Sequence, residues 1–228
     1  MQRLRRELSR IPVDRWLTRG ECERWRRIRA PQRAWQWLAG RWLAKQLLLD
    51  EVVDRKLSTL DLQIESRDAR DRGTRPRVFC RGQLQPWQVS ISHSWGTVYV
   101  AVALGGRARI GVDVTSRRSL SPAFARFWLT PAEREWCGES AELACCLWSL
   151  KESFYKALGE GRRFLPRQLD MASTLSLQEV LPDPLVRRRS WHLPHHAADT
   201  VLCRCRSGEV TSLVWVRDHA RQAQDAYS

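Results

Sequence analysis

The stretch from Trp148 to Gly159 constrains this chain more than any other, because helical spacing turns its charged side chains into a site. It reads Trp-Ser-Leu-Lys-Glu-Ser-Phe-Tyr-Lys-Ala-Leu-Gly. At about 3.6 residues per turn, Glu152 and Lys156 are i,i+4 neighbours, and a glycine favours the end of a helix. The pattern predicts a helix that presents a carboxylate beside an ammonium. Taken alone, this pair is also compatible with an ordinary solvated ion pair.

A predicted strand earlier in the chain carries a second carboxylate. Residues 110–115 read Ile-Gly-Val-Asp-Val-Thr. Strand alternation puts Gly111, Asp113 and Thr115 on one face and the β-branched residues on the other. Two carboxylates from separate elements beside a lysine suit magnesium, which takes one or two protein carboxylates and completes its shell with water and phosphate oxygens. Asp113 alone is equally compatible with a strand-end or turn acid, because strand interiors are poor in Asp.

A third segment, residues 87–94, reads Trp-Gln-Val-Ser-Ile-Ser-His-Ser and predicts a strand that ends in a polar cluster. A serine next to a histidine raises the possibility of a hydrolase. However, the chain has no Gly-x-Ser-x-Gly elbow, and no acid is evident that would orient the histidine. Hydroxyl and imidazole donors are better suited to bind phosphate.

In this order, the three segments resemble the 4′-phosphopantetheinyl transferases of the surfactin-synthetase type. That family reads Ile/Leu-Ser-His-Ser, then Gly-Ile/Val-Asp-Ile/Val-Glu, then Trp-x-x-Lys-Glu-Ser-x-x-Lys-x-x-Gly. Upstream, Thr74-Arg75-Pro76 is similar to the family's Gly-Lys-Pro, and Leu38-Ala39-Gly40-Arg41 is similar to its Leu-Ala-Gly-Arg helix. The resemblance covers about residues 30–165. The remaining C-terminal residues carry no motif that matches.

The resemblance implies transfer of 4′-phosphopantetheine from coenzyme A, as substrate, to a serine of an acyl or peptidyl carrier protein, with Mg²⁺ as cofactor. The implied metal ligands are Asp113 and Glu152. The implied catalytic residues are Glu152, as the base that takes the serine proton, and Lys156, which neutralises charge on the leaving phosphate. Contacts with coenzyme A are implied for a set of basic and polar residues: Arg33, Arg75, Ser92, His93 and Lys156.

One position departs from the family pattern. Where the family usually has a second acid after Gly-Val-Asp-Val, this chain has Thr115, which offers a hydroxyl and no carboxylate. The implied metal site then rests on Asp113 and Glu152, with water or Thr115 in the remaining position. The change therefore bears on metal affinity and metal preference.

The formal net charge of +14 and the pI near 10.5 are typical of a protein that attracts polyanions. A basic nucleic-acid-binding protein without catalysis is therefore the alternative function. No zinc finger, helix-turn-helix or RNA-recognition motif organises this charge, so we expect nucleic acid to bind only nonspecifically. Coenzyme A carries phosphates and carrier proteins are typically acidic, so a transferase would use the same charge for both partners.

The amino-acid composition also indicates the cellular compartment of the protein. The seven cysteines form no Cys-x-x-Cys pair, and their odd number argues against a closed disulfide framework. No apolar run approaches the roughly 18 residues that span a bilayer. The basic N-terminus is not followed by a signal-peptide core. We expect a cytoplasmic monomer with no membrane contact.

The order of elements predicts an α+β fold. We expect a helix from Pro31 to near Asp50, a loop over residues 66–77, and helices that begin near Pro122 and after Thr130. Predicted strands cover residues 88–92, 97–104, 109–114, 200–205 and 210–216. The resemblance implies two similar halves related by pseudo-twofold symmetry, each a small antiparallel sheet packed with a long helix. The implied halves are residues 1–107 and 108–228, with the active site in the cleft between them.

Overall fold

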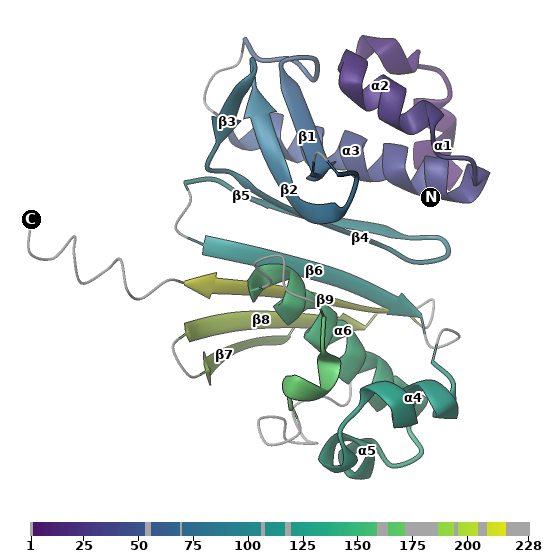
Figure 1. The fold of residues 1–228 in the computed structure, drawn as a ribbon, viewed down its shortest axis with the longest axis vertical. Coiled ribbons are helices and arrows are strands. Elements are labelled where there is room, and N and C mark those ends of the chain that lie inside the picture. Colours follow the sequence, from purple (N-terminus) through teal and green to yellow (C-terminus); the bar gives the residue numbers. More distant parts are fainter. Residues whose placement is uncertain are drawn as a thin grey trace, which may run out of the picture. The chain divides into compact units, whose positions relative to one another are not determined.

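The computed structural model consists of helices, strands and ordered turns (Figure 1). The structure describes residues 2–52, 56–68, 70–105, 108–116, 120–158, 164–171, 187–193, 196–204 and 209–217. The chain divides into two compact units, Met1–Ala108 and Arg109–Ser228.

The first unit combines helices with two small antiparallel sheets. Its elements are α1 (Gln2–Leu8), the 3₁₀ turn η1 (Val13–Arg15), α2 (Arg19–Arg26), α3 (Pro31–Glu51), β1 (Leu62–Arg67), β2 (Gly73–Cys80), β3 (Gln83–Gln85), β4 (Gln88–His93) and β5 (Val98–Ala103). Strands β1, β2 and β3 form one sheet, and β4 and β5 form the other. Helix α3 packs against β4 and β5. Apolar side chains of α3, including Ala44 and Leu48, bury those of β1 and β2 in one core cluster.

The second unit places its longest helix against a four-stranded antiparallel sheet. Its elements are β6 (Ala108–Ser116), α4 (Pro122–Trp128), α5 (Pro131–Cys137), α6 (Ala141–Leu158), the 3₁₀ turn η3 (Pro166–Gln168), β7 (Arg187–Leu193), β8 (His196–Arg204) and β9 (Glu209–Arg217). The strand order is β6-β9-β8-β7. Leu147, Leu150 and Phe154 of α6 pack with Val214 and Val216 of β9 in the core.

The α+β fold class, with small antiparallel sheets and helices, is confirmed. The predicted helix from Pro31 is α3, and Thr130 closes a capping box at the start of α5. The cysteine side chains that the structure describes are free thiols. In the same part of the chain, no helix has the length and apolar character needed to cross a bilayer. The pseudo-twofold relation between the halves stays a prediction.

The prediction of a loop over residues 66–77 is wrong. Strand β1 continues to Arg67 and β2 begins at Gly73, so most of this stretch is a β-hairpin. Asp68 holds its turn, because one carboxylate oxygen accepts from the backbone N–H groups of Arg70 and Arg72, each at 2.9 Å. Across the strands, Glu65 pairs with Arg77 at 3.0 Å. Opposite charges and an Asx turn thus stabilise a hairpin that has little hydrophobic alternation.

Some predictions concern residues outside the described ranges. These are the glycine stop at Gly159, the turn at Gly106 and Arg107 with the boundary between the halves, and the side chains of Cys203 and Cys205.

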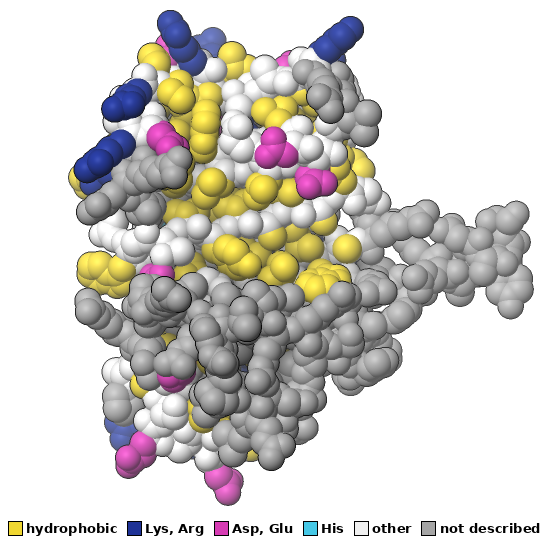
Figure 2. Space-filling view, turned by 180° about the vertical axis from the view of Figure 1, so that it is seen from behind, with side chains coloured by type: hydrophobic (Ala, Val, Ile, Leu, Met, Phe, Trp, Pro, Cys, Tyr) yellow, Lys and Arg dark blue, Asp and Glu magenta, His cyan; other side chains and the backbone are white. Residues whose placement is uncertain are grey.

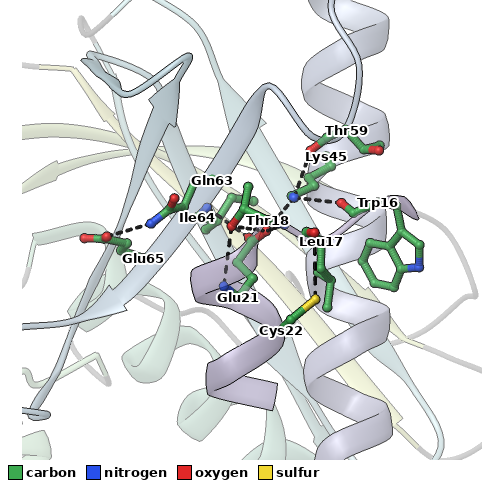
Figure 3. A network of polar contacts seen from close by, with 10 residues as sticks. All are labelled: Trp16, Leu17, Thr18, Glu21, Cys22, Lys45, Thr59, Gln63, Ile64 and Glu65. Carbon is green, nitrogen blue, oxygen red and sulfur yellow. Dashed lines mark hydrogen bonds and ion pairs between the residues drawn. The ribbon is translucent and has the colours of Figure 1, made fainter. Parts of the chain in front are cut away.

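A buried lysine ties the long helix of the first unit to helix α2 (Figure 3). The ammonium of Lys45 donates to Glu21 Oε2 at 2.6 Å and to the carbonyl oxygens of Trp16 at 3.0 Å and Thr59 at 2.9 Å. Each of its three protons therefore has an acceptor. The other carboxylate oxygen of Glu21 accepts from the backbone N–H of Ile64 at 3.1 Å. This cluster joins α2, α3 and β1.

The second unit contains a similar set of contacts, made by different residues. Lys151 of α6 is fully buried and donates to Glu133 Oε2 and to the carbonyl oxygen of Pro166. The other carboxylate oxygen of Glu133 accepts from the backbone N–H of Met171 at 2.9 Å. In both units the glutamate closes the capping box of a short helix, α2 or α5. Lys151 is thus a structural residue, and it points away from the charged pair beside it in sequence.

Replacing Lys45 by methionine should destabilise the first unit, because Glu21 would be left buried without its cation. Breaking a buried ion pair costs about 3–5 kcal/mol. Urea denaturation followed by tryptophan fluorescence measures the loss. Lys56→Met removes the same charge from an exposed position and should change the free energy of unfolding by less than about 0.5 kcal/mol. Equal midpoints for the two variants would contradict this role of Lys45.

Candidate active site

Strand β6 and helix α6 approach so closely that only glycine fits at residue 111. A Cβ atom added to Gly111 would lie 1.9 Å from the carbonyl oxygen of Ser153 and 2.6 Å from the backbone nitrogen of Ala157. Neither backbone atom can move without moving the helix. The face of β6 that carries Gly111 therefore lies against α6, and the next residue on that face is Asp113.

Lys156 joins a carboxylate of β6 to a carboxylate of α6. Its ammonium lies 2.9 Å from Asp113 Oδ1 and 3.7 Å from Glu152 Oε2, and it donates to the carbonyl oxygen of Val112 at 3.1 Å. The Asp113 side chain is only 7% exposed, whereas those of Lys156 and Glu152 are 26% and 22% exposed. The predicted i,i+4 pair is therefore present, and the same ammonium contacts the acid of the strand.

Thr115 takes part in this cluster through its hydroxyl group. It is buried, and its Oγ1 donates to Asp113 Oδ2 at 2.6 Å. The residue at position 115 thus faces the same space as Asp113, as strand alternation predicts. The hydroxyl oxygen retains acceptor capacity, but it carries no charge.

Buried serines hold α6 against β9, the neighbour of β6 in the sheet. The Ser212 hydroxyl lies 2.8 Å from Ser149 Oγ and 2.6 Å from Ser153 Oγ, and it donates to the Ser149 carbonyl oxygen. All three side chains are almost completely buried. Because the backbone of Ser153 also lies against Gly111, the same face of α6 packs on β6 and on β9, which are neighbours in one sheet. This fixes the rotation of α6 and so the direction in which Glu152 points.

Burial raises the pKa of Glu152 above its ordinary value. The ammonium of Lys156 opposes this shift, and the negative charge of Asp113 adds to it. A carboxylate with a raised pKa is a stronger base than an exposed one.

Aromatic side chains surround the neighbouring part of α6. The rings of Trp148 and Tyr155 lie 5.5 Å and 4.6 Å from the ring of Phe164, and Trp148 also contacts Phe124 of α4 at 4.7 Å. Because both rings contact Phe164, Trp148 and Tyr155 lie near one face of the helix. These rings shield the helix beside the charged cluster from water.

The donor set of the cluster fits magnesium. Asp113 and Glu152 supply two carboxylates, Thr115 supplies a neutral oxygen, and no sulfur or imidazole is among these groups. Within the described ranges no group of three or more His, Cys, Asp or Glu side chains could hold a metal ion. A pair of carboxylates is nevertheless enough for magnesium, which completes its shell with water and phosphate oxygens.

The remaining predicted residues belong to the first unit. Arg33 of α3 and His93 of β4 are brought together, with 3.3 Å between Arg33 Nη1 and His93 Nε2. Ser92, one residue earlier on β4, is buried. Helix α3 also reaches the turn after β4, because the Gln36 amide donates to the carbonyl oxygen of Ser94 at 2.9 Å. Arg75 lies on β2 in the other sheet of the unit, half-buried.

Comparison with known proteins finds a similarity in the second unit. Residues 109–202 match the family model of the 4′-phosphopantetheinyl transferase superfamily. The match covers less than half of the chain, all of it in the second unit. It begins in β6 and contains Asp113, Glu152 and Lys156. No curated protein matches the chain.

Sequence reasoning did not identify the roles of Gly111 and of the serines. A glycine inside a predicted strand often marks the close approach of another backbone. The contact at Gly111 could therefore have been predicted from the sequence. Serines give no comparable signal, because serine is mostly exposed in folded proteins and its burial here is not indicated by the sequence. Lys156 also donates to the carbonyl oxygen of Val112. Every residue has a backbone carbonyl, so no sequence pattern predicts this contact.

Gly111→Ala should disrupt the site, because its new methyl group would overlap the backbone of α6. We expect a lower melting temperature and loss of the contact between Asp113 and Lys156. Gly73→Ala is the matched control, because Gly73 also lies on a strand and a Cβ there meets nothing within 4 Å. Thermal unfolding by circular dichroism compares the two variants. A Gly111→Ala protein as stable as the Gly73→Ala protein would show that β6 and α6 do not meet at this residue.

Proposed function

We propose that this protein transfers 4′-phosphopantetheine from coenzyme A to a serine hydroxyl of an acyl or peptidyl carrier protein, in the manner of the surfactin-synthetase type. The observation that supports the proposal most directly is the contact of Lys156 with both Asp113 and Glu152. This contact lies inside the region that matches the superfamily model.

The reaction forms a bond between the serine oxygen and the β-phosphorus of coenzyme A. The bond from that phosphorus to the bridging oxygen breaks, and 3′,5′-adenosine diphosphate leaves with the electron pair. The serine proton must go to a base, and negative charge must be neutralised on the leaving phosphate. Magnesium, when bound, neutralises and orients the pyrophosphate.

Each residue of the cluster has a role in this proposal. Asp113 and Glu152 would hold the metal. Glu152 is also the candidate base, directly or through water, because its pKa is raised and its side chain remains partly exposed. Lys156 would neutralise charge that grows on the leaving group. Its long, partly exposed side chain can follow that charge as the bond breaks.

The nucleotide end of coenzyme A requires cationic and hydrogen-bonding groups. In this proposal Arg33 and His93, which lie in contact, bind phosphate together with Ser92 and Arg75. An acidic carrier protein would be attracted by the overall positive charge of the chain. That the site lies in a cleft between the halves, and that the chain is a cytoplasmic monomer, stay predictions.

The proposal is tested by incubating the protein with coenzyme A, magnesium and a panel of apo-carrier proteins and weighing the products. Glu152→Gln should retain the fold and lose nearly all transfer, because the amide keeps the shape but is neither a base nor an anionic ligand. Loss of a general base alone costs roughly a hundredfold or more. Glu135→Gln, at an exposed position of α5, is the control and should react as the parent does. Transfer by Glu152→Gln within about threefold of the parent would contradict the role.

Thr115→Glu should strengthen magnesium binding, because it adds the acid that the family usually has at this position. The Thr115 hydroxyl already contacts Asp113, so a carboxylate there would face the same space. We expect a lower magnesium concentration for half-maximal transfer. An unchanged metal dependence, with a folded variant, would show that residue 115 has no part in metal binding.

A nucleic-acid-binding function is the alternative, and the surface charge of the first unit favours it. In Figure 2, Lys and Arg side chains lie at separate points along the edge of the view, most of them at the top. Exposed arginines on and around α1 and α2 include Arg6, Arg10, Arg15, Arg26, Arg27 and Arg29.

DNA binding across a salt series separates the two functions, because its slope reports the number of phosphates neutralised. The transferase should bind DNA weakly and with strong salt dependence, and Glu152→Gln should not alter that binding. Tight, sequence-selective DNA binding by a parent protein that transfers nothing would favour the alternative. In that case, replacing the arginines of α2 should abolish binding.

A further inference from the structure

The ammonium of Lys156 lies where a metal ion shared by Asp113 and Glu152 would have to bind. It is 2.9 Å from one carboxylate and 3.7 Å from the other. A magnesium ion would need to come within about 2.1 Å of an oxygen of each. A divalent cation and the ammonium therefore cannot hold these positions together without strong repulsion between their charges.

Burial explains why the chain needs a cation at this point. Asp113 is almost fully buried, and an ionised carboxylate in such a place requires a compensating charge. Thr115 supplies a hydrogen bond but no charge. Lys156 supplies the charge, and the Val112 carbonyl oxygen fixes its ammonium over the end of the strand.

Lys156 differs in one respect from the other lysines that form ion pairs. Lys45 and Lys151 are fully buried, whereas the Lys156 side chain is 26% exposed. Its contact with Glu152, at 3.7 Å, is also longer than its contact with Asp113, at 2.9 Å. The ammonium can therefore leave toward solvent or toward an incoming phosphate, which the other two lysines cannot do.

We propose that Lys156 is the built-in counter-cation of the Asp113–Glu152 pair, and that a divalent cation must displace it from Asp113 in order to bind. The metal affinity of the protein without coenzyme A is then lowered by this competition. Substrate phosphates favour the exchange, because they attract the displaced ammonium. This inference rests on one part of the proposed function, namely that a metal ion binds to Asp113 and Glu152.

Lys156→Gln tests the competition without any catalytic step. Binding of Mn²⁺ to the full chain, without coenzyme A or carrier protein, can be measured from the electron paramagnetic resonance signal of the free ion. We expect the variant to bind Mn²⁺ at least about tenfold more tightly than the parent, because a repelling charge is removed from contact distance. Lys56→Gln makes the same charge change at an exposed site of the first unit and should bind Mn²⁺ as the parent does.

A second measurement uses the parent chain and does not depend on the stability of a variant. The sequence contains only four lysines, and two of them are fully buried. With isotope-labelled lysine, the side-chain resonance of Lys156 should shift in a saturable way as Mg²⁺ is added, while that of Lys56 should not. An unmoved Lys156 resonance at a Mg²⁺ concentration that supports transfer would overturn the inference and leave the transferase intact. Equal Mn²⁺ affinity in the parent and in a folded Lys156→Gln variant would overturn it as well.

Discussion

The candidate site depends on one backbone contact, between Gly111 of β6 and the turn of α6 at Ser153. This contact sets the register of the strand along the helix. Glu152 precedes Ser153 and Lys156 follows it by one turn, so both lie near the residue that comes two positions after Gly111, which is Asp113. A shift of the strand by one residue would turn Asp113 to the opposite face. Hydrogen bonds from Ser149 and Ser153 of α6 to Ser212 of the neighbouring strand β9 oppose rotation of the helix.

Lysine is used in this chain where an arginine would not fit. Only four of its basic residues are lysines, yet three of those form ion pairs: Lys45, Lys151 and Lys156. An ammonium has three protons, and the three acceptors around Lys45 satisfy all of them. A guanidinium has five N–H donors in a rigid plane, so some would be left buried without an acceptor. The geometry of the acceptors therefore explains the choice of lysine at position 45.

Much of the fold could be predicted from the sequence because its signals are local. The helix from Pro31, the capping box at Thr130 and the strand of Asp113 all follow from neighbouring residues. The 66–77 hairpin could not, because cross-strand charge pairs and an Asx turn replace the apolar alternation that identifies strands. For the candidate site, the sequence predicts which residue types take part and on which face of the strand or helix each one lies. The position of Lys156 on Asp113 could not be predicted, because it depends on how closely β6 and α6 pack.

The two units share a structural cluster but differ in the chemistry beside it. In each, a capping-box glutamate pairs with a buried lysine of the long helix, and this holds the helix in place. The residue after that lysine is Gln46 in α3 and Glu152 in α6, and one turn further on are Asp50 and Lys156. Among the described residues, therefore, only α6 presents an acid and a lysine in this order. The buried lysine fixes the helix in both units, and the two helices differ in the charges of the exposed or half-buried residues that follow it.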